Sequence, residues 1–221
     1  MGKRQSPIPS FEFELRYRHQ GFSSIAGIDE VGRGAFAGPL VAAAVVLPEK
    51  FAYTDKIRDS KLLSAKERTT QAEIIKAHAV FYAIEEIPLT YINQFGVGKA
   101  GQLAFSNLVS TVLQAMTSAF FLIDGFPVQG FDPSKQLAIV KGDQKSYSIA
   151  AASIIAKVYR DTLMESMGER YSVYNFAKNK GYGTADHRNA LKKFGVSDMH
   201  RTSFNLTRFL WLMYCVMEFC G

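Results

Sequence analysis

Residues 25–47 carry the stretch IAGIDEVGRGAFAGPLVAAAVVL. Two apolar runs, 24–31 and 39–47, flank the glycine-rich segment GRGAFAG. Because that segment is too short for a crossover helix, we predict that the two runs form neighbouring antiparallel strands. The first strand should end on two adjacent carboxylates, Asp29 and Glu30.

The rest of the chain alternates strand and helix patterns, which predicts an α/β fold. Ser64 and Glu67 have the spacing of a capping box, with Ser60 as the alternative N-cap. We expect further strands at 80–87, 118–124 and 136–143, and helices from residue 59, over 89–116 with breaks at Gly96 and Gly98, from 147 to about 168, and over 185–193. Without repeats or long linkers, the pattern favours one domain over 1–221, with an N-terminal extension at 1–23 and a C-terminal helical part from about 170.

Composition excludes several classes of protein. The 221 residues are 48% hydrophobic and 21% charged, which is typical of a globular chain and not of a disordered, collagen-like or coiled-coil one. The two cysteines, Cys215 and Cys220, exclude a disulfide framework and a Cys-rich zinc site, and they favour a reducing compartment, the cytosol. The four histidines lack the spacing of a zinc site.

We expect neither a secretory signal nor a membrane span at the ends of the chain, although the opening MGKRQS fits the short myristoylation pattern of Gly2 with Ser6. The N-terminus has no apolar core of a secretory signal. The most apolar run, Phe209 to Met217, has nine residues, whereas a membrane span needs about 20. We expect a buried C-terminal helix there, with an interaction helix as the alternative.

The positive charge is concentrated in one part of the chain. Residues 1–134 hold 13 basic and 13 acidic side chains, whereas residues 135–221 hold 13 basic and 7 acidic ones. A one-sided basic excess indicates a polyanionic partner such as nucleic acid, although a solvated lysine face would give the same count.

Carboxylates stand where the predicted strands end. Asp124 follows the run FFLI, and Asp143 follows AIVKG. If the strands are neighbours, Asp29, Asp124 and Asp143 converge at one edge of the sheet with Glu30 close by, and such a cluster needs divalent cations of the kind that serve phosphoryl transfer. The alternative is that each aspartate merely caps a turn.

The segment GRG at 32–34 is a second candidate site. Its glycines permit positive φ, and its N–H groups can form an anion nest, although tight hairpin turns use glycine as well. Arg33 beside the Asp29–Glu30 pair favours contact with phosphate or ribose.

These residues resemble ribonuclease HII. The opening IAGIDEVGRGAFAGPLVAAAVVLP is similar to the start of that family, and the later blocks DSKLLSAKER, LIDG, KGDQKSYSIAAASIIAKVYRD, NKGYGTADHRNAL and HRTSF follow in the same order. The resemblance runs from about Ser24 to Phe204. Ala35 and Phe36 depart from the GRGPLAGP of many members.

The resemblance implies a fold and a set of site residues. The fold would be RNase H-like, a five-stranded mixed sheet flanked by helices with a C-terminal helical part. Four carboxylates would be catalytic and would hold a divalent metal, Mg²⁺ or Mn²⁺: Asp29, Glu30, Asp124 and Asp143. The GRG segment would contact a ribose 2′-OH, and Tyr182 would stack on the following deoxyribose. Further substrate contacts, to phosphates, are expected from Lys61, Lys141, Lys145, Arg201 and Ser203.

The implied activity is endonucleolytic. The enzyme would hydrolyse RNA in RNA–DNA hybrids and cut 5′ of single ribonucleotides in duplex DNA, leaving a 3′-OH and a 5′-phosphate, in ribonucleotide removal and replication-associated RNA removal. We expect a cytoplasmic monomer whose partner is the nucleic acid. The alternatives are the ribonuclease HIII type, disfavoured by GRG instead of GTG and by the short stretch of about 23 residues before the first strand, and a catalytically dead binding module.

Overall fold

The computed structural model describes residues 8–52, 57 and 63–210. The chain divides into two compact units, each assembled from separate stretches. Unit 1 comprises Met1–Val31, Val41–Glu86 and Gly101–Val158, and unit 2 comprises Gly32–Leu40, Ile87–Ala100 and Tyr159–Gly221. Because the chain passes between the units several times, no single linker separates them, and the single-domain organisation stays a prediction.

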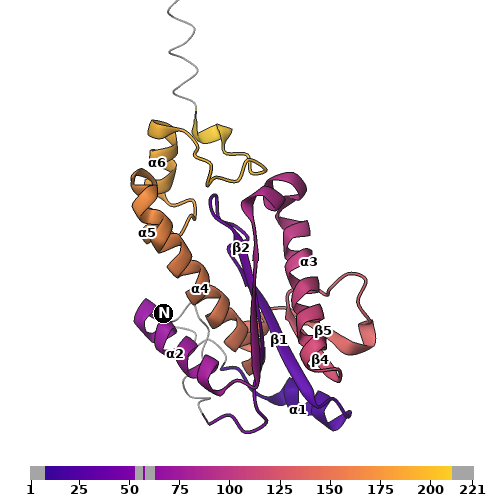
Figure 1. Cartoon of the computed structure of the whole chain (residues 1–221). Helices are drawn as coiled ribbons and strands as arrows, with labels where there is room; N and C mark the ends of the chain where they lie inside the picture. The colour runs from indigo at the N-terminus through magenta and orange to yellow at the C-terminus, as the bar shows by residue number, and fades with distance from the viewer. Residues whose placement is uncertain (1–7, 53–56, 58–62, 211–221) are drawn as a thin grey trace, which may run out of the picture. The chain divides into compact units, whose positions relative to one another are not determined.

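The five strands form one mixed sheet in the order β3-β2-β1-β4-β5 (Figure 1). β1 is antiparallel to β2 and parallel to β4, and β4 is parallel to β5. The predicted antiparallel pair and the predicted five-stranded mixed sheet are therefore confirmed. The strands span Ser24–Val31 (β1), Leu40–Val46 (β2), Phe81–Ile87 (β3), Ala119–Asp124 (β4) and Gln136–Ile139 (β5).

Four predicted helices are present in the described residues, whereas the helices Glu12–His19 and Phe176–Asn179 were not predicted. Ser64 caps α2 in a complete capping box with Glu67, as predicted. Within α3 only Gly96 has a non-helical backbone, so the expected break at Gly98 was wrong. The α-helices span Glu12–His19 (α1), Ala65–His78 (α2), Leu89–Ala115 (α3), Tyr147–Arg170 (α4), Phe176–Asn179 (α5) and Ala185–Phe194 (α6). None of the helices in the described part of the chain is long and apolar enough to cross a membrane.

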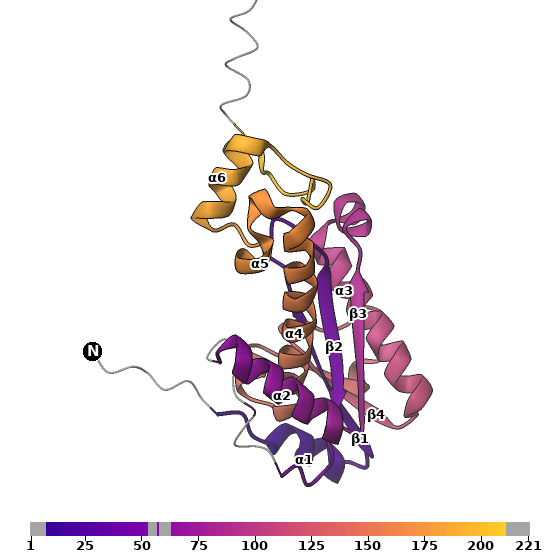
Figure 2. The same ribbon diagram turned by 60° about the vertical axis from the view of Figure 1, so that its left-hand side comes forward.

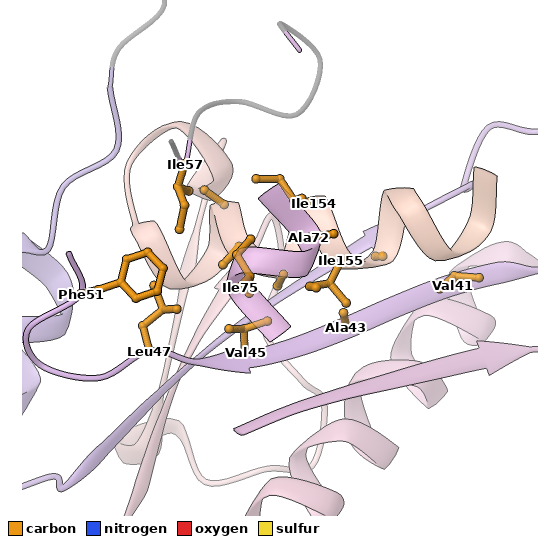
Figure 3. Close-up of a cluster of buried hydrophobic side chains, with 14 residues drawn as sticks. Val41, Ala43, Val45, Leu47, Phe51, Ile57, Ala72, Ile75, Ile154 and Ile155 are labelled. Atoms are coloured by element: carbon orange, nitrogen blue, oxygen red, sulfur yellow. The ribbon is translucent and has the colours of Figure 1, made fainter. Parts of the chain in front are cut away.

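The main core of unit 1 lies between β2 and two helices. Alternate β2 residues point to one face of the sheet, and there Val41, Ala43 and Val45 pack against Ile75 of α2 and Ile155 of α4 (Figure 3). In Figure 2, α2 and the unit 1 part of α4 (147–158) lie on the same side of β2, and the unit 1 part of α3 (101–115) lies on the other side. This face anchors the first half of α4 against the sheet.

Unit 2 has an apolar core of its own. Met164 from the end of α4 packs with Tyr174, Phe176 and Leu191, and the buried Ala37 completes this cluster. The loop that follows GRG is therefore part of the core of unit 2 and not a free surface loop.

The last predicted strand and the predicted C-terminal helix differ from the expected bounds. β5 stops at Ile139, four residues before Asp143, because Lys141 has a left-handed backbone with φ 56° and a 3₁₀ turn follows at Gly142–Gln144. In the tail, Thr207–Phe209 forms a 3₁₀ turn. The rest of the predicted C-terminal helix lies outside the described residues.

Candidate active site

The position of Asp29 depends on a close approach between β1 and α4. A Cβ on Gly27 would come within 2.1 Å of the backbone carbon of Ser148, so only glycine lets the start of α4 pack so near the strand. Gly27 and Asp29 are two residues apart and share a face of the sheet. Asp29 is buried at 6% exposure and is hydrogen-bonded to Ser153 of α4.

Asp124 lies beside Asp29 on the neighbouring parallel strand. The last paired residues of β1 and β4 are Ile28 and Ile123, and the two aspartates follow directly. Asp124 Oδ1 accepts a hydrogen bond of 2.6 Å from the Gly142 backbone N–H. That bond ties the end of β4 to the 3₁₀ turn that holds Asp143, which is also buried.

The four carboxylates act on one another electrostatically. Burial raises the pKa of Asp29 well above its ordinary value, and the negative charges of Asp124, Glu30 and Asp143 raise it further, while the Ser153 hydrogen bond opposes this. The predicted convergence is therefore present as a concentration of negative charge in unit 1, in which both Asp29 and Asp143 are buried.

The donor set fits a hard divalent cation, because carboxylate oxygens are the ligands that Mg²⁺ and Mn²⁺ prefer. Two of these carboxylates accept hydrogen bonds from backbone N–H groups. Asp29 Oδ1 accepts from the Glu30 N–H at 2.7 Å, and Asp124 Oδ1 accepts from the Gly142 N–H. In the described part of the chain, no three His, Cys, Asp or Glu side chains already form a group that could hold a metal.

The GRG segment belongs to unit 2 and begins a tightly held loop. Gly32 has φ +89°, and a Cβ there would meet Arg160 Nε at 2.2 Å, so both backbone and space require glycine. The Ala35 N–H donates to the Gly32 carbonyl at 3.2 Å and closes the turn. Arg33 and Gly34 are exposed at its tip.

Arg201 holds this loop from inside unit 2. It is fully buried, and its guanidinium donates to the carbonyls of Arg33, Gly38 and Pro39 at 2.9–3.1 Å. Burial and the nearby charge of Arg160 lower the pKa of Arg201 to about 9, so it remains protonated at neutral pH. The sequence suggested a phosphate contact, whereas the structure directs these donors to backbone carbonyls.

Arg160 is a site residue that sequence reasoning missed. It is completely buried on α4 and donates to the carbonyls of Ala37 and Pro39 at 3.0 Å and of Lys180 at 2.9 Å. Its guanidinium lies 5.4 Å from the centre of the Tyr182 ring. The available sequence signal was its place in the block KGDQKSYSIAAASIIAKVYRD, which resembles the family.

Tyr182 is half-buried in the loop between α5 and α6. An isolated antiparallel bridge pairs it with Ala35, so the loop that carries Tyr182 runs beside the loop that carries GRG within unit 2. The two predicted recognition elements are therefore brought together.

The remaining predicted contacts belong to both units. Lys141 and Lys145 are exposed in unit 1, at either side of the turn that holds Asp143, and Ser203 is exposed in unit 2. Lys61 lies outside the described residues.

Comparison with known proteins identifies the family. The family model described as ribonuclease HII matches residues 26–207. A ribonuclease HII of Caldanaerobacter subterraneus is 42% identical over 192 residues, which cover 87% of this chain and 78% of the relative. That of Synechococcus sp. is 44% identical, with 89% of this chain and 88% of the relative covered.

Solved structures share the fold. The PCNA:RNase HII complex from Archaeoglobus fulgidus contains a chain that matches with a TM-score of 0.69 at 24% identity, covering 80% of this chain and 92% of that one. Bst-RNase HIII in complex with Mn²⁺ matches with a TM-score of 0.69 at 20% identity, covering 88% and 71%. The fold is thus RNase H-like, and the sequence match shows that this chain is a ribonuclease H enzyme that belongs to the ribonuclease HII family.

Proposed function

We propose that this enzyme cuts RNA in RNA–DNA hybrids and cleaves 5′ of single ribonucleotides in duplex DNA, leaving a 3′-OH and a 5′-phosphate. The observation that carries the proposal is the buried Asp29 among the charges of Asp124, Glu30 and Asp143, in a chain of this family. A carboxylate in that environment favours a bound cation over an empty site.

A divalent metal is part of the proposal. Asp29, Glu30, Asp124 and Asp143 would hold Mg²⁺ or Mn²⁺, and the bound ion would supply an activated water and stabilise charge on the phosphate. A Mn²⁺ complex of an RNase HIII with the same fold is consistent with this assignment. The protein's own contribution is to hold the ligands: Ser153 orients Asp29, and the Gly142 N–H orients Asp124.

Unit 2 would supply substrate recognition. The exposed Arg33 and Gly34 stand at the tip of a loop whose backbone is held by Arg160 and Arg201, so polar groups at the tip are preorganised for a ribose 2′-OH. Tyr182, in the adjoining loop, would stack on the next deoxyribose. Lys141, Lys145, Lys61 and Ser203 are the proposed phosphate contacts.

The test is a cleavage assay with product mapping. An end-labelled DNA duplex with one ribonucleotide, a long RNA–DNA hybrid and an all-DNA duplex are each incubated with protein and Mg²⁺ or Mn²⁺. We expect cuts at the 5′ side of the ribonucleotide with a 3′-OH and a 5′-phosphate, cleavage of the hybrid and none of the DNA. Asp143→Asn is the matched inactive variant. Binding without cleavage by the wild type would identify a catalytically dead module instead.

A further inference from the structure

Two buried histidines in unit 2 form a direct hydrogen bond. His187 of α6 and His200 are 0% and 1% exposed, and their Nε2 atoms are 3.0 Å apart. On the far side of each ring, His187 Nδ1 lies 3.0 Å from the Tyr182 carbonyl oxygen, and His200 Nδ1 accepts from the Ser197 N–H at 2.9 Å. Both rings are therefore engaged at both nitrogens.

The partners assign the protons of this pair. A carbonyl oxygen only accepts, so His187 Nδ1 carries its proton and, in a neutral ring, His187 Nε2 is the acceptor. His200 Nε2 must then donate to it, which leaves His200 Nδ1 free to accept from Ser197. Burial lowers the pKa of both rings, that of His200 to about 4, so both are neutral at neutral pH. A single directed chain runs from Ser197 through the two rings to Tyr182.

This chain joins two loops that already enclose the segment after GRG. Phe36 N–H donates to the Gly181 carbonyl at 2.8 Å on one side of that segment, and Gly38 N–H donates to the Met199 carbonyl at 2.9 Å on the other side. The histidine pair links the two outer loops through side chains, and its last bond ends on the carbonyl of Tyr182.

We propose that His187 and His200 are positioning residues for substrate recognition: they hold Tyr182 by its backbone carbonyl and so set the ring for the nucleotide that follows the ribose. This proposal rests on the proposed function of Tyr182. It assigns a task to two histidines that have no place in metal binding or in the chemical step. The same carbonyl accepts a hydrogen bond of 2.8 Å from the backbone N–H of Thr184, the N-cap of α6, and the His187 ring adds a side-chain anchor from within that helix.

Paired variants separate the hydrogen bond from the volume of the ring. His187→Asn keeps an N–H where Nδ1 lies, whereas His187→Leu fills the space without a donor. The measurement is kcat/KM on a single-ribonucleotide duplex divided by kcat/KM on a long hybrid. We expect His187→Leu to lower this ratio about five- to tenfold, as for one lost hydrogen bond, and His187→Asn to restore most of it. Equal effects of both variants, or an unchanged ratio, would overturn the proposal.

A double-mutant cycle and a spectrum complete the test. If His187 acts through Tyr182, the double variant His187→Leu/Tyr182→Ala should have the same ratio of kcat/KM values as Tyr182→Ala alone. Additive effects of the two substitutions would contradict the proposal. The imidazole ¹⁵N spectrum of the wild type should show His187 protonated at Nδ1 and His200 at Nε2, and any other tautomers would refute the chain. The ¹⁵N spectrum can be recorded whether or not the protein is active. A wild type that cleaves neither substrate would refute the proposed function instead.

Discussion

Asp124 Oδ1 accepts a hydrogen bond of 2.6 Å from the Gly142 backbone N–H, so the carboxylate at the end of β4 orients the turn that carries Asp143. One proposed metal ligand thereby positions another. The bond also explains why Gly142 is buried close to Asp124: a Cβ there would lie 3.3 Å from Oδ1 and 2.6 Å from Ile149 Cδ1.

Asp124→Asn should abolish most activity while keeping the fold, because the amide oxygen can still accept from Gly142 but the negative charge is lost. We expect cleavage to fall by roughly a hundred- to a thousandfold or more, the scale of losing one preorganised electrostatic contact. Cleavage rates and circular dichroism check this, with the exposed Asp132→Asn as the control. Full activity in Asp124→Asn would contradict the assignment of the carboxylate cluster.

Asp29→Asn should make the metal-free protein more stable at neutral pH. Because the pKa of Asp29 is raised in the folded state, folded protein binds more protons than unfolded protein between the ordinary value near 4 and the raised one, and stability falls as pH rises through that window. Removing the charge removes this cost, and melting temperature should rise by about 2–4 °C for each kcal/mol gained.

The same melting experiment reports on the metal. Adding Mg²⁺ or Mn²⁺ should stabilise the wild type by mass action and should stabilise Asp29→Asn much less. If the ion shifts the melting temperature of both proteins equally, it binds elsewhere than at Asp29.

Arg201→Lys should lower the free energy of unfolding. A lysine keeps the charge but cannot reach the Arg33, Gly38 and Pro39 carbonyls together, and each buried acceptor left unpaired costs about 1–3 kcal/mol. The midpoint of urea unfolding measures this, and the exposed Arg170→Lys is the control. Weaker substrate binding with unchanged stability would instead support the phosphate contact expected from the sequence.

Tyr182→Ala should weaken cleavage of a single embedded ribonucleotide more than cleavage of a long hybrid. Stacking on an aromatic ring contributes about 1–3 kcal/mol, so we expect a differential loss of about fivefold or more. Tyr182→Phe keeps the ring and should keep most of the discrimination. Equal slowing on both substrates together with a partly melted circular dichroism spectrum would make Tyr182 a packing residue.

Substrate affinity should depend steeply on salt. The inactive Asp124→Asn protein, titrated with hybrid duplex, should give a linear fall of log affinity with log salt, with a slope of about −0.9 for each phosphate neutralised. Lys141→Gln should make the slope shallower by about one unit if that exposed lysine contacts a phosphate, and Lys99→Gln, on the α3 segment of unit 2, is the comparison. An affinity that does not change with salt would contradict the inference that the basic excess of residues 135–221 binds nucleic acid.

The sequence pattern alone was sufficient for individual strands and for the carboxylates at their ends, whereas the five-stranded mixed sheet was expected from the family resemblance. Alternating and continuous apolar runs have a period set by the backbone, so β1, β2 and β4 were predictable, and so was the capping box of Ser64 and Glu67. Asp29 and Asp124 were predictable as well, because a position at the end of a strand is a local property of the chain.

Tertiary structure decided how the recognition residues are held. Nothing local in the sequence reveals that Arg160 and Arg201 direct their guanidinium groups to backbone carbonyls 123 and 163 positions away. Nor does it reveal that His187 meets His200, 13 positions on, because that contact depends on how the intervening chain folds back. A sequence does not distinguish a buried arginine on a helix from an arginine on a basic surface. Only packing, which withdraws one from water and leaves it carbonyl partners, distinguishes a residue that holds a loop from one that binds a phosphate.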